Sequence, residues 1–286
     1  MSHERISPTA WFVAYQRTLS DIPLASEIFG ELDKIIRQTG PSPEAAGIDA
    51  LKSSPMSIIW EARFKIVTHV LNLHGAKQVL ELAAGFSPRG LNMTSDASVT
   101  YVEVDLPGLV EDKRQIIETL VDQGKLPVQP NFHLLEGNAL HRDDLLAATR
   151  FFGDAPTAVV NEGLISYLDR AERVALAQNV HALLERFGGV WITPDIEIPL
   201  AEGNLGQTAE QIKARTGQIE TITGIDVLKN RFENEAAARV FFENLGFQIE
   251  RHSFMEVADQ LVGVSPSPLA QKAIEQSVLY AMTIKF

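Results

Sequence analysis

The chain has 286 residues, a formal net charge of −12 and no cysteine, which excludes disulfides, thiolate nucleophiles and cysteine-bound metals. Its length allows one large domain or two small ones, and its 45% hydrophobic and 22% charged residues are typical of a globular protein with a substantial core. The acidic balance argues against nucleic acid or an anionic membrane as a partner, and no apolar run is long enough to span a membrane.

The first 75 residues are predicted to be helical. Apolar residues recur at helical spacing over Ile22–Ile36 and over Ile58–Leu73. Between them, Gly40–Gly47 is rich in proline and glycine and is predicted to be a loop. We therefore expect residues 1–75 to form a helical N-terminal cap on the rest of the domain, which runs from 76 to 286.

From residue 76 onward, short apolar runs alternate with helical patterns. This alternation indicates a mainly parallel sheet covered by helices on both faces. The predicted strands are Gln78–Leu82, Thr100–Val104, Asn131–Leu135, Ala158–Asn161, Val190–Thr193, Phe247–Phe254 and Val278–Lys285. The predicted helices are Leu109–Gln123, Asp143–Phe151, Ala171–Phe187 and Asn234–Asn244.

The segment Pro194–Gly224 is polar, rich in glycine and threonine, and without strong periodicity. We expect it to begin a lid, covering about residues 194–235, that faces the substrate. The last two strands are predicted to be joined by the Pro/Ser turn SPSPL. Together the elements predict an α/β fold: one Rossmann-like domain built on a seven-stranded, mainly parallel sheet.

The stretch from Lys77 to Asp105 contains the most informative spacing. A small-residue turn follows the first strand, and Asp105, at the end of the second strand, lies 20 positions after Gly85. In Rossmann-type units an acid at this spacing accepts hydrogen bonds from ribose hydroxyls, which indicates a nucleotide-like ligand. Two alternatives stay open: Glu103 points to the same side of the strand, or Asp105 caps the following helix.

Polar residues also follow the third and fourth strands. Asn138 can bind an adenine edge, or it can simply form an Asn-containing turn. Glu162 ends the fourth strand, and Tyr167 follows five positions later. A carboxylate at the end of an apolar strand needs a partner, which a cationic ligand would provide.

At this point the motifs resemble a known family. VLELAAGFSPRG, YVEVDLPGLVEDKR, GNAL and NEGLISYL, in that order, resemble the leucine carboxyl methyltransferase-like family of class I S-adenosylmethionine (SAM) dependent methyltransferases. The upstream segments TAWFVAYQRTLSDIPLASEIF and SIIWEARFKIV also resemble that family. It includes bacterial O-methyltransferases that act on small molecules and polyketides. The resemblance covers roughly residues 9–195 and rests on the order of the motifs.

The resemblance implies a Rossmann-like methyltransferase fold, SAM as the cofactor and S-adenosylhomocysteine as its product. It also implies a role for each matching residue. These are Arg63 and, as a second candidate, Arg17 for the methionine carboxylate, Gly85 for the methionine portion, Asp105 for the ribose, Asn138 and Ala139 for the adenine, and Glu162 for the methionine amino group.

The chain departs from the family pattern at Ala83, at Ser87 and at Asn138. Many relatives have LGAG followed by Asp-Thr-Arg, whereas this chain has LAAG, with Ala83 at the first glycine position, followed by Ser87-Pro88-Arg89. Asn138 also replaces a more usual aspartate. These departures leave open a degenerate domain that binds SAM or a partner without catalysis.

Methyl transfer to a carboxylate needs no base, whereas transfer to a hydroxyl benefits from one. The candidates for that base are Tyr167, which is our predicted catalytic residue, together with Tyr15 and His252. The alternatives are that Tyr167 packs as a half-buried aromatic and that His252 is a surface strand residue. No metal is expected, because the seven histidines form no pair at ligand spacing.

Two other enzyme classes share parts of the pattern. The turn Gly85–Arg89 is similar to the start of a hydrolase nucleophile elbow but lacks its second glycine. A nicotinamide-dependent oxidoreductase shares the Gly85–Asp105 spacing but leaves Glu162 unexplained.

We therefore predict a SAM-dependent O-methyltransferase that acts on a hydroxyl or carboxylate of a small molecule. Because the first residues lack a signal peptide, we expect it in the cytoplasm, and the sequence does not indicate an oligomeric state.

Overall fold

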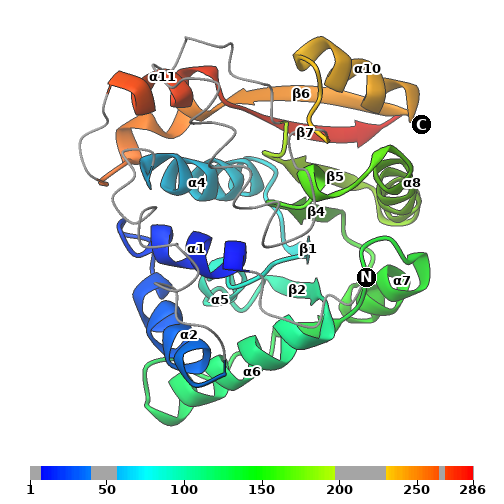
Figure 1. The fold of residues 1–286 in the computed structure, drawn as a ribbon. Coiled ribbons are helices and arrows are strands. Elements are labelled where there is room, and N and C mark those ends of the chain that lie inside the picture. The colour runs from blue at the N-terminus through cyan, green and yellow to red at the C-terminus, as the bar shows by residue number, and fades with distance from the viewer. Residues whose placement is uncertain (1–7, 40–56, 197–229, 264–267, 286) are drawn as a thin grey trace.

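The structure is a computed structural model that describes residues 8–39, 57–196, 230–263 and 268–285 (Figure 1). Before residue 76 it contains the helices α1 (Pro8–Arg17), α2 (Ala25–Thr39) and α4 (Ser57–Leu73). The two helices predicted in this part of the chain are therefore confirmed. The division into a cap and a core stays a prediction, and the central part of the expected lid, 197–229, lies outside the described residues.

A seven-stranded sheet forms the centre of the fold, with the strand order β3-β2-β1-β4-β5-β7-β6. Strands β1 to β5 are parallel, and β7 runs antiparallel to both of its neighbours. The strands are β1 (Gln78–Leu82), β2 (Thr100–Asp105), β3 (Phe132–Glu136), β4 (Thr157–Asn161), β5 (Gly189–Thr193), β6 (Phe247–Ser253) and β7 (Val278–Ile284). Each predicted strand is confirmed with ends that differ by at most one residue, and so is the Rossmann-like α/β class.

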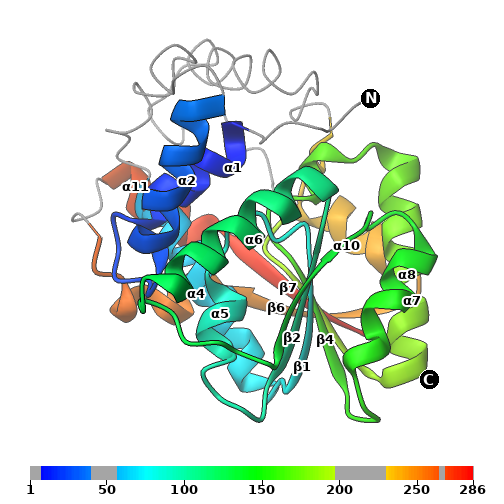
Figure 2. The ribbon, with the colours of Figure 1, turned by 90° about the horizontal axis from the view of Figure 1, so that it is seen from below.

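Helices cover both faces of this sheet, as Figure 2 shows. Helices α7 (Arg142–Ala148), α8 (Arg170–Phe187) and α10 (Glu235–Asn244) lie on one side and α4 and α11 (Pro268–Gln276) on the other, and each side contributes its own apolar cluster. The other helices and 3₁₀ turns are α5 (Arg89–Met93), α6 (Pro107–Asp122), η1 (Thr149–Phe151), η2 (Ile165–Tyr167) and η3 (Phe254–Gln260). None of the described helices is both long enough and apolar enough to cross a membrane.

The connection between β6 and β7 differs from the prediction of a simple Pro/Ser turn. Strand β6 leads into η3, which Ser253 and Glu256 begin with a reciprocal capping box. Helix α11 then precedes β7. The apolar spacing in these short elements spans too few turns to stand out in the sequence, because each contacts the core through a few residues only.

Trp191, in the middle of β5, links the core to the strand ends. It is fully buried and its ring lies 5.4 Å from that of Phe242 and 5.3 Å from that of Phe247, measured between ring centroids. Its indole N–H donates a hydrogen bond of 2.7 Å to Oδ1 of Asn161, the last residue of β4. The large aromatic core therefore fixes the orientation of the strand end that precedes Glu162.

Two glycines provide a matched test of how closely helix α5 packs against the sheet. A Cβ added to Gly90 in α5 would lie 2.6 Å from Cε2 of Phe132 and 2.7 Å from Oε1 of Glu103, whereas one added to the exposed Gly30 in α2 meets nothing within 4 Å. We expect Gly90→Ala to lower the free energy of unfolding by about 1–3 kcal/mol through overpacking. Gly30→Ala should raise it by about 0.5–1 kcal/mol, since alanine is the better helix former.

Urea denaturation of the two variants beside the parent protein measures both effects. Similar changes in the two variants would contradict the close contact between α5 and the sheet.

Candidate functional site

The strand order reverses direction between β1 and β4, so the carboxyl ends of these strands form the edge where open α/β sheets bind ligands. Asp105, at the end of β2, lies at this edge and is 7% exposed. Its Oδ2 accepts a hydrogen bond of 2.7 Å from the backbone N–H of Gly85, and its Oδ1 accepts one of 2.8 Å from Leu106. The structure thus brings together the two residues that the 20-residue spacing singled out.

The two alternatives for Asp105 are both wrong. Leu106 is the N-cap of α6, and no side chain caps that helix. Glu103 is fully buried and pairs with Nζ of Lys113 at 2.5 Å, which also donates to the carbonyl of Ser87. Burial raises the pKa of Glu103 to about 7 even though Lys113 opposes the shift. Glu103 therefore holds the turn after β1 against β2 from the buried side, and Asp105 is the carboxylate at the ligand-binding edge of the sheet.

The turn after β1 contains two residues in the left-handed conformation, Ala83 with φ of 53° and Gly85 with φ of 52°. The N–H of Ala83 donates to the carbonyl of Val104 at 2.8 Å, which holds the turn against β2. Glycine adopts this conformation freely, whereas alanine pays about 1 kcal/mol for it. The departure from the family pattern at position 83 thus falls where the backbone is strained.

Glu162 lies at the centre of a buried charge cluster at the end of β4. Its Oε1 is 2.9 Å from Nη2 of Arg17 in α1 and 3.7 Å from Nε of Arg63 in α4, and its Oε2 is 2.6 Å from Nη2 of Arg89 in α5. The side chain of Glu162 is only 5% exposed. Burial alone would raise its pKa, but the three guanidinium groups lower the pKa of Glu162 to about 2. The carboxylate is therefore charged at neutral pH.

Arg89 connects this cluster to the middle of the sheet. It is completely buried, its Nη1 lies 2.5 Å from Oε1 of Glu81 in β1, and Oε2 of Glu81 accepts a hydrogen bond from the hydroxyl of Tyr101. Its guanidinium carbon also lies 4.5 Å from the ring centroid of Phe64. No role for Arg89 was predicted from the sequence, although it occupies the place of the arginine in the relatives' Asp-Thr-Arg pattern.

Asp195, two residues after β5, is a second residue that the sequence reasoning missed. Its carboxylate, in a residue 2% exposed, pairs with Arg63 and accepts a hydrogen bond of 2.7 Å from Nδ2 of Asn161. It also accepts three backbone N–H bonds of 2.8–3.0 Å from the loop that follows Glu162, at residues 163–165. The sequence places it at the start of the expected lid, but its contacts show that it shapes the end of β4.

The predicted adenine residues lie at the end of β3. Oδ1 of Asn138 accepts a hydrogen bond from the N–H of Leu140 at 2.9 Å, which is the Asn-containing turn that the sequence left open. The N–H of Asn138 donates to Asp144 at 2.8 Å. Ala139 is 9% exposed, and its carbonyl accepts a hydrogen bond from Asn179. The side-chain oxygen of Asn138 is thus already used locally.

The three candidate bases occupy different parts of the fold. Tyr167 is half-buried in η2, the turn that follows the loop held by Asp195. Tyr15 is half-buried in α1, where its ring stacks on Trp11 with centroids 5.9 Å apart. His252, predicted to be a surface residue, is only 6% exposed, because the segments around β6 cover it. That prediction is wrong.

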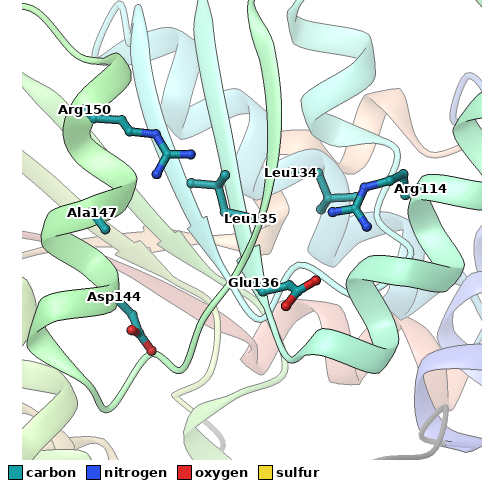
Figure 3. Close-up of a pocket in the computed structure, with 7 residues that line it drawn as sticks. All are labelled: Arg114, Leu134, Leu135, Glu136, Asp144, Ala147 and Arg150. Carbon is teal, nitrogen blue, oxygen red and sulfur yellow. The ribbon is translucent and has the colours of Figure 1, made fainter.

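A pocket of about 290 Å³ lies at the outer edge of β3, away from the charge cluster (Figure 3). Arg114 of α6 and Arg150 of η1 lie on either side of the strand, and Glu136 lies between them. Two lining residues border predicted site residues: Asp144 supports the turn at Asn138, and Glu136 pairs with Asp105 between β3 and β2. Strand β2 separates this pocket from β1, β4 and the switch point between them.

Comparisons with known proteins find relatives in sequence and in fold. The sequence model described as leucine carboxyl methyltransferase matches residues 52–181. A protein of Mycolicibacterium paratuberculosis, with the name "Putative S-adenosyl-L-methionine-dependent methyltransferase", is 26% identical over 211 residues, which are 72% of this chain and 59% of that protein. A second protein of the same organism and name is 25% identical over 292 residues, covering 94% of this chain and 87% of its own.

A relative from Mycobacterium ulcerans with the same name is 29% identical over 195 residues, so the chain spans about three fifths of the length of the first relatives it matches. Among solved structures, a DUF574 family protein from Streptomyces avermitilis is 17% identical, covers 99% of this chain and 100% of its own, and superposes with a TM-score of 0.54. That likeness shows the fold.

The chain therefore has a Rossmann-like α/β fold of the methyltransferase type, with a buried charge cluster at the switch point. The resemblance to the leucine carboxyl methyltransferase family, predicted from the ordered motifs, is confirmed.

The pKa of Glu162 gives a test of the charge cluster. Because its pKa is about 2 in the folded chain and 4.5 in its ordinary state, its stabilisation is fully present above pH 4.5 and is lost as pH falls toward 2. We expect Glu162→Gln to lower the free energy of unfolding by about 3 kcal/mol at pH 7 and by about 1 kcal/mol at pH 3.

Urea denaturation at the two pH values measures this difference. The control is Glu111→Gln, which removes an exposed carboxylate paired with Arg114 and should change stability little at either pH. A Glu162→Gln penalty of the same size at pH 7 and pH 3 would show that its ionised form is not what stabilises the fold.

Proposed function

We propose that this chain is a SAM-dependent methyltransferase that transfers a methyl group to a hydroxyl or carboxylate oxygen of a small molecule. The observation that carries the proposal is the meeting of Arg17, Arg63 and Glu162 at the end of β4, with Asp105 held against Gly85 at the end of β2, on the other side of β1. The family resemblance and the names of the relatives support SAM as the cofactor.

The charge cluster suits the methionine end of SAM. Three guanidinium groups, of Arg17, Arg63 and Arg89, face three carboxylates, of Glu81, Glu162 and Asp195, so the cluster is balanced. The methionine end of SAM carries one carboxylate and one ammonium group, and it can enter without leaving an uncompensated buried charge.

In this proposal Arg63, assisted by Arg17, binds the methionine carboxylate, and Glu162 accepts a hydrogen bond from the ammonium group. Glu162 is prepared for that role because its lowered pKa keeps it charged. Arg89 is a positioning residue, since it is fully buried and fixes one oxygen of Glu162.

Asp105 would bind the ribose. Each of its oxygens accepts one backbone N–H in the structure, and a carboxylate has about four acceptor positions, so about two remain for the ribose hydroxyls. Gly85, held by the same carboxylate, would line the methionine portion. Asn138 and Ala139 would flank the adenine through the backbone and shape of their turn, since Oδ1 of Asn138 is occupied.

SAM supplies a methyl group that the sulfonium already activates. Transfer to the acceptor oxygen would form the O–CH₃ bond and break the S–CH₃ bond, with S-adenosylhomocysteine as the product. The chain has to align the acceptor and exclude water. A carboxylate acceptor loses no proton, whereas a hydroxyl acceptor does, and Tyr167 on η2 is the group we propose to take it.

A pair of ligands tests the assignment of Arg63. We expect Arg63→Ala to weaken SAM binding by about 10–100-fold, because a charged hydrogen-bond partner of the carboxylate is lost. Decarboxylated SAM, which lacks that carboxylate, should lose far less affinity. Calorimetric titration of the parent and the variant with both ligands gives the comparison.

The matched control is Arg114→Ala, which removes an arginine from the pocket at the edge of β3 and should leave both affinities unchanged. Equal losses for the two ligands in Arg63→Ala would remove this residue from the carboxylate site. A loss in Arg114→Ala would move the cofactor to the other pocket.

The nature of the acceptor atom can be read from the product. We expect methyl groups transferred from labelled SAM to be released as volatile methanol by mild alkali when the acceptor is a carboxylic acid, because only esters hydrolyse under these conditions. Phenol and alcohol acceptors should instead give alkali-stable ethers. Label found on nitrogen by mass spectrometry of the product, with none on oxygen, would contradict the O-methyltransferase proposal.

A further inference from the structure

A group of metal-binding side chains lies outside the site described above, where the end of α4 meets the edge strand β6. His74 follows α4 directly, and Glu250 and His252 are two residues apart on β6. One ligand atom from each of the three lies within 4.8 Å of the others. His74 lies 178 residues before His252 along the chain (252 − 74), so the sequence did not show that these two histidines come together.

His252 provides the evidence that this group binds a ligand. It is 94% buried (6% exposed), and its Nε2 has no hydrogen-bond partner among the described residues. A buried polar nitrogen without a partner is costly, and native structures rarely keep one without a reason. The nearest acid is Glu250, whose Oε1 lies 3.6 Å from that nitrogen, beyond hydrogen-bond distance.

The other nitrogen of the same ring is firmly held. Nδ1 of His252 lies 2.9 Å from Oε2 of Glu256, and the second oxygen of Glu256 accepts the N–H of Ser253 in the capping box of η3. A carboxylate on one ring nitrogen keeps the proton there and leaves a lone pair on the other. This arrangement of carboxylate, histidine and free lone pair is the one that metal-binding histidines use.

The remaining two residues provide matching ligands on the open side. His74 is exposed and the side chain of Glu250 is 65% exposed, so an ion can reach them from solvent and complete its coordination with water. Alternation along β6 places Glu250 on the same face of the strand as His252, toward α4. Two imidazoles and one carboxylate form a donor set that zinc and related transition metals prefer over magnesium or calcium.

We propose that His74, Glu250 and His252 form a binding site for a divalent transition metal ion, with Zn²⁺ as the best match. The ion would connect the end of α4 to an edge strand that is hydrogen-bonded on one side only, to β7. Its role is structural, because none of its ligands belongs to the charge cluster at Glu162 or contacts Asp105. Binding to the folded chain alone stabilises it.

The alternative occupant of the site is a proton. A charged His252 between Glu250 and Glu256 would form ion pairs without any metal, and His69, 3.8 Å from Glu256, would share that carboxylate. In this arrangement His74 has no role. Removing the His74 imidazole therefore separates the two possibilities.

The test uses the full chain after removal of any histidine tag and of bound metal by a chelator. We expect calorimetric titration to show one Zn²⁺ per chain with a Kd in the micromolar range or tighter, and Co²⁺ to give visible absorption bands of a site with nitrogen ligands. His74→Ala and Glu250→Gln should each weaken Zn²⁺ at least about 10-fold. Both positions are exposed, so both variants can fold.

His141→Ala is the matched control, since it removes another histidine, 68% exposed at its side chain, from a different part of the chain. It should leave Zn²⁺ affinity unchanged, and Zn²⁺ should raise the melting temperature of this variant and of the parent but not of His74→Ala. No uptake by the parent protein at about 100 µM free Zn²⁺, or equal affinity in parent and His74→Ala, would overturn the proposal.

Discussion

The ionised carboxylate of Glu162, buried under three guanidinium groups, is the interaction on which the carboxyl edge of this fold depends. A buried charge is tolerated only when partners surround it, and here each partner comes from a different helix, α1, α4 or α5. The same ion pairs thus tie the N-terminal helices to the end of β4 and bring together positive and negative charges in balance.

Other buried carboxylates join distant segments by the same rule. Glu61 in α4 is 1% exposed and accepts the N–H groups of Val262 and Gly263, each at 2.9 Å, so it holds the end of η3 against the helix. Asp195 likewise holds the loop after β4, and Glu103 holds the turn after β1 through Lys113. Each of these acids satisfies backbone or cationic groups that would otherwise be buried without partners.

The fold was largely predictable because its strands are short apolar runs bounded by turn residues. Their register follows from burial on both faces, which leaves little freedom to misplace an end. Elements that bury only a few side chains, η3 and α11, were missed. His252 was predicted to be exposed because the sequence does not show that Glu256 of η3 and His74 at the end of α4 would lie close to it.

The site was predictable in part. Spacing alone linked Gly85 to Asp105, and the end of the fourth strand singled out Glu162. The family resemblance added Arg17 and Arg63, which the structure brings into one cluster with Glu162. Asp195 was missed because nothing local marks a carboxylate whose partners lie about 30 residues earlier and in α4. Asn138 shows the opposite case: the resemblance assigned this residue to the adenine, but its side-chain oxygen is used by its own turn.

The central claim is that the balanced cluster at Glu162 and the carboxylate of Asp105 together bind SAM. Calorimetric titration of the purified protein with SAM, S-adenosylhomocysteine and NAD, side by side, tests it most directly. We expect micromolar binding of both adenosyl sulfur ligands and no binding of NAD. Binding of NAD alone, or of none of the three, would contradict it.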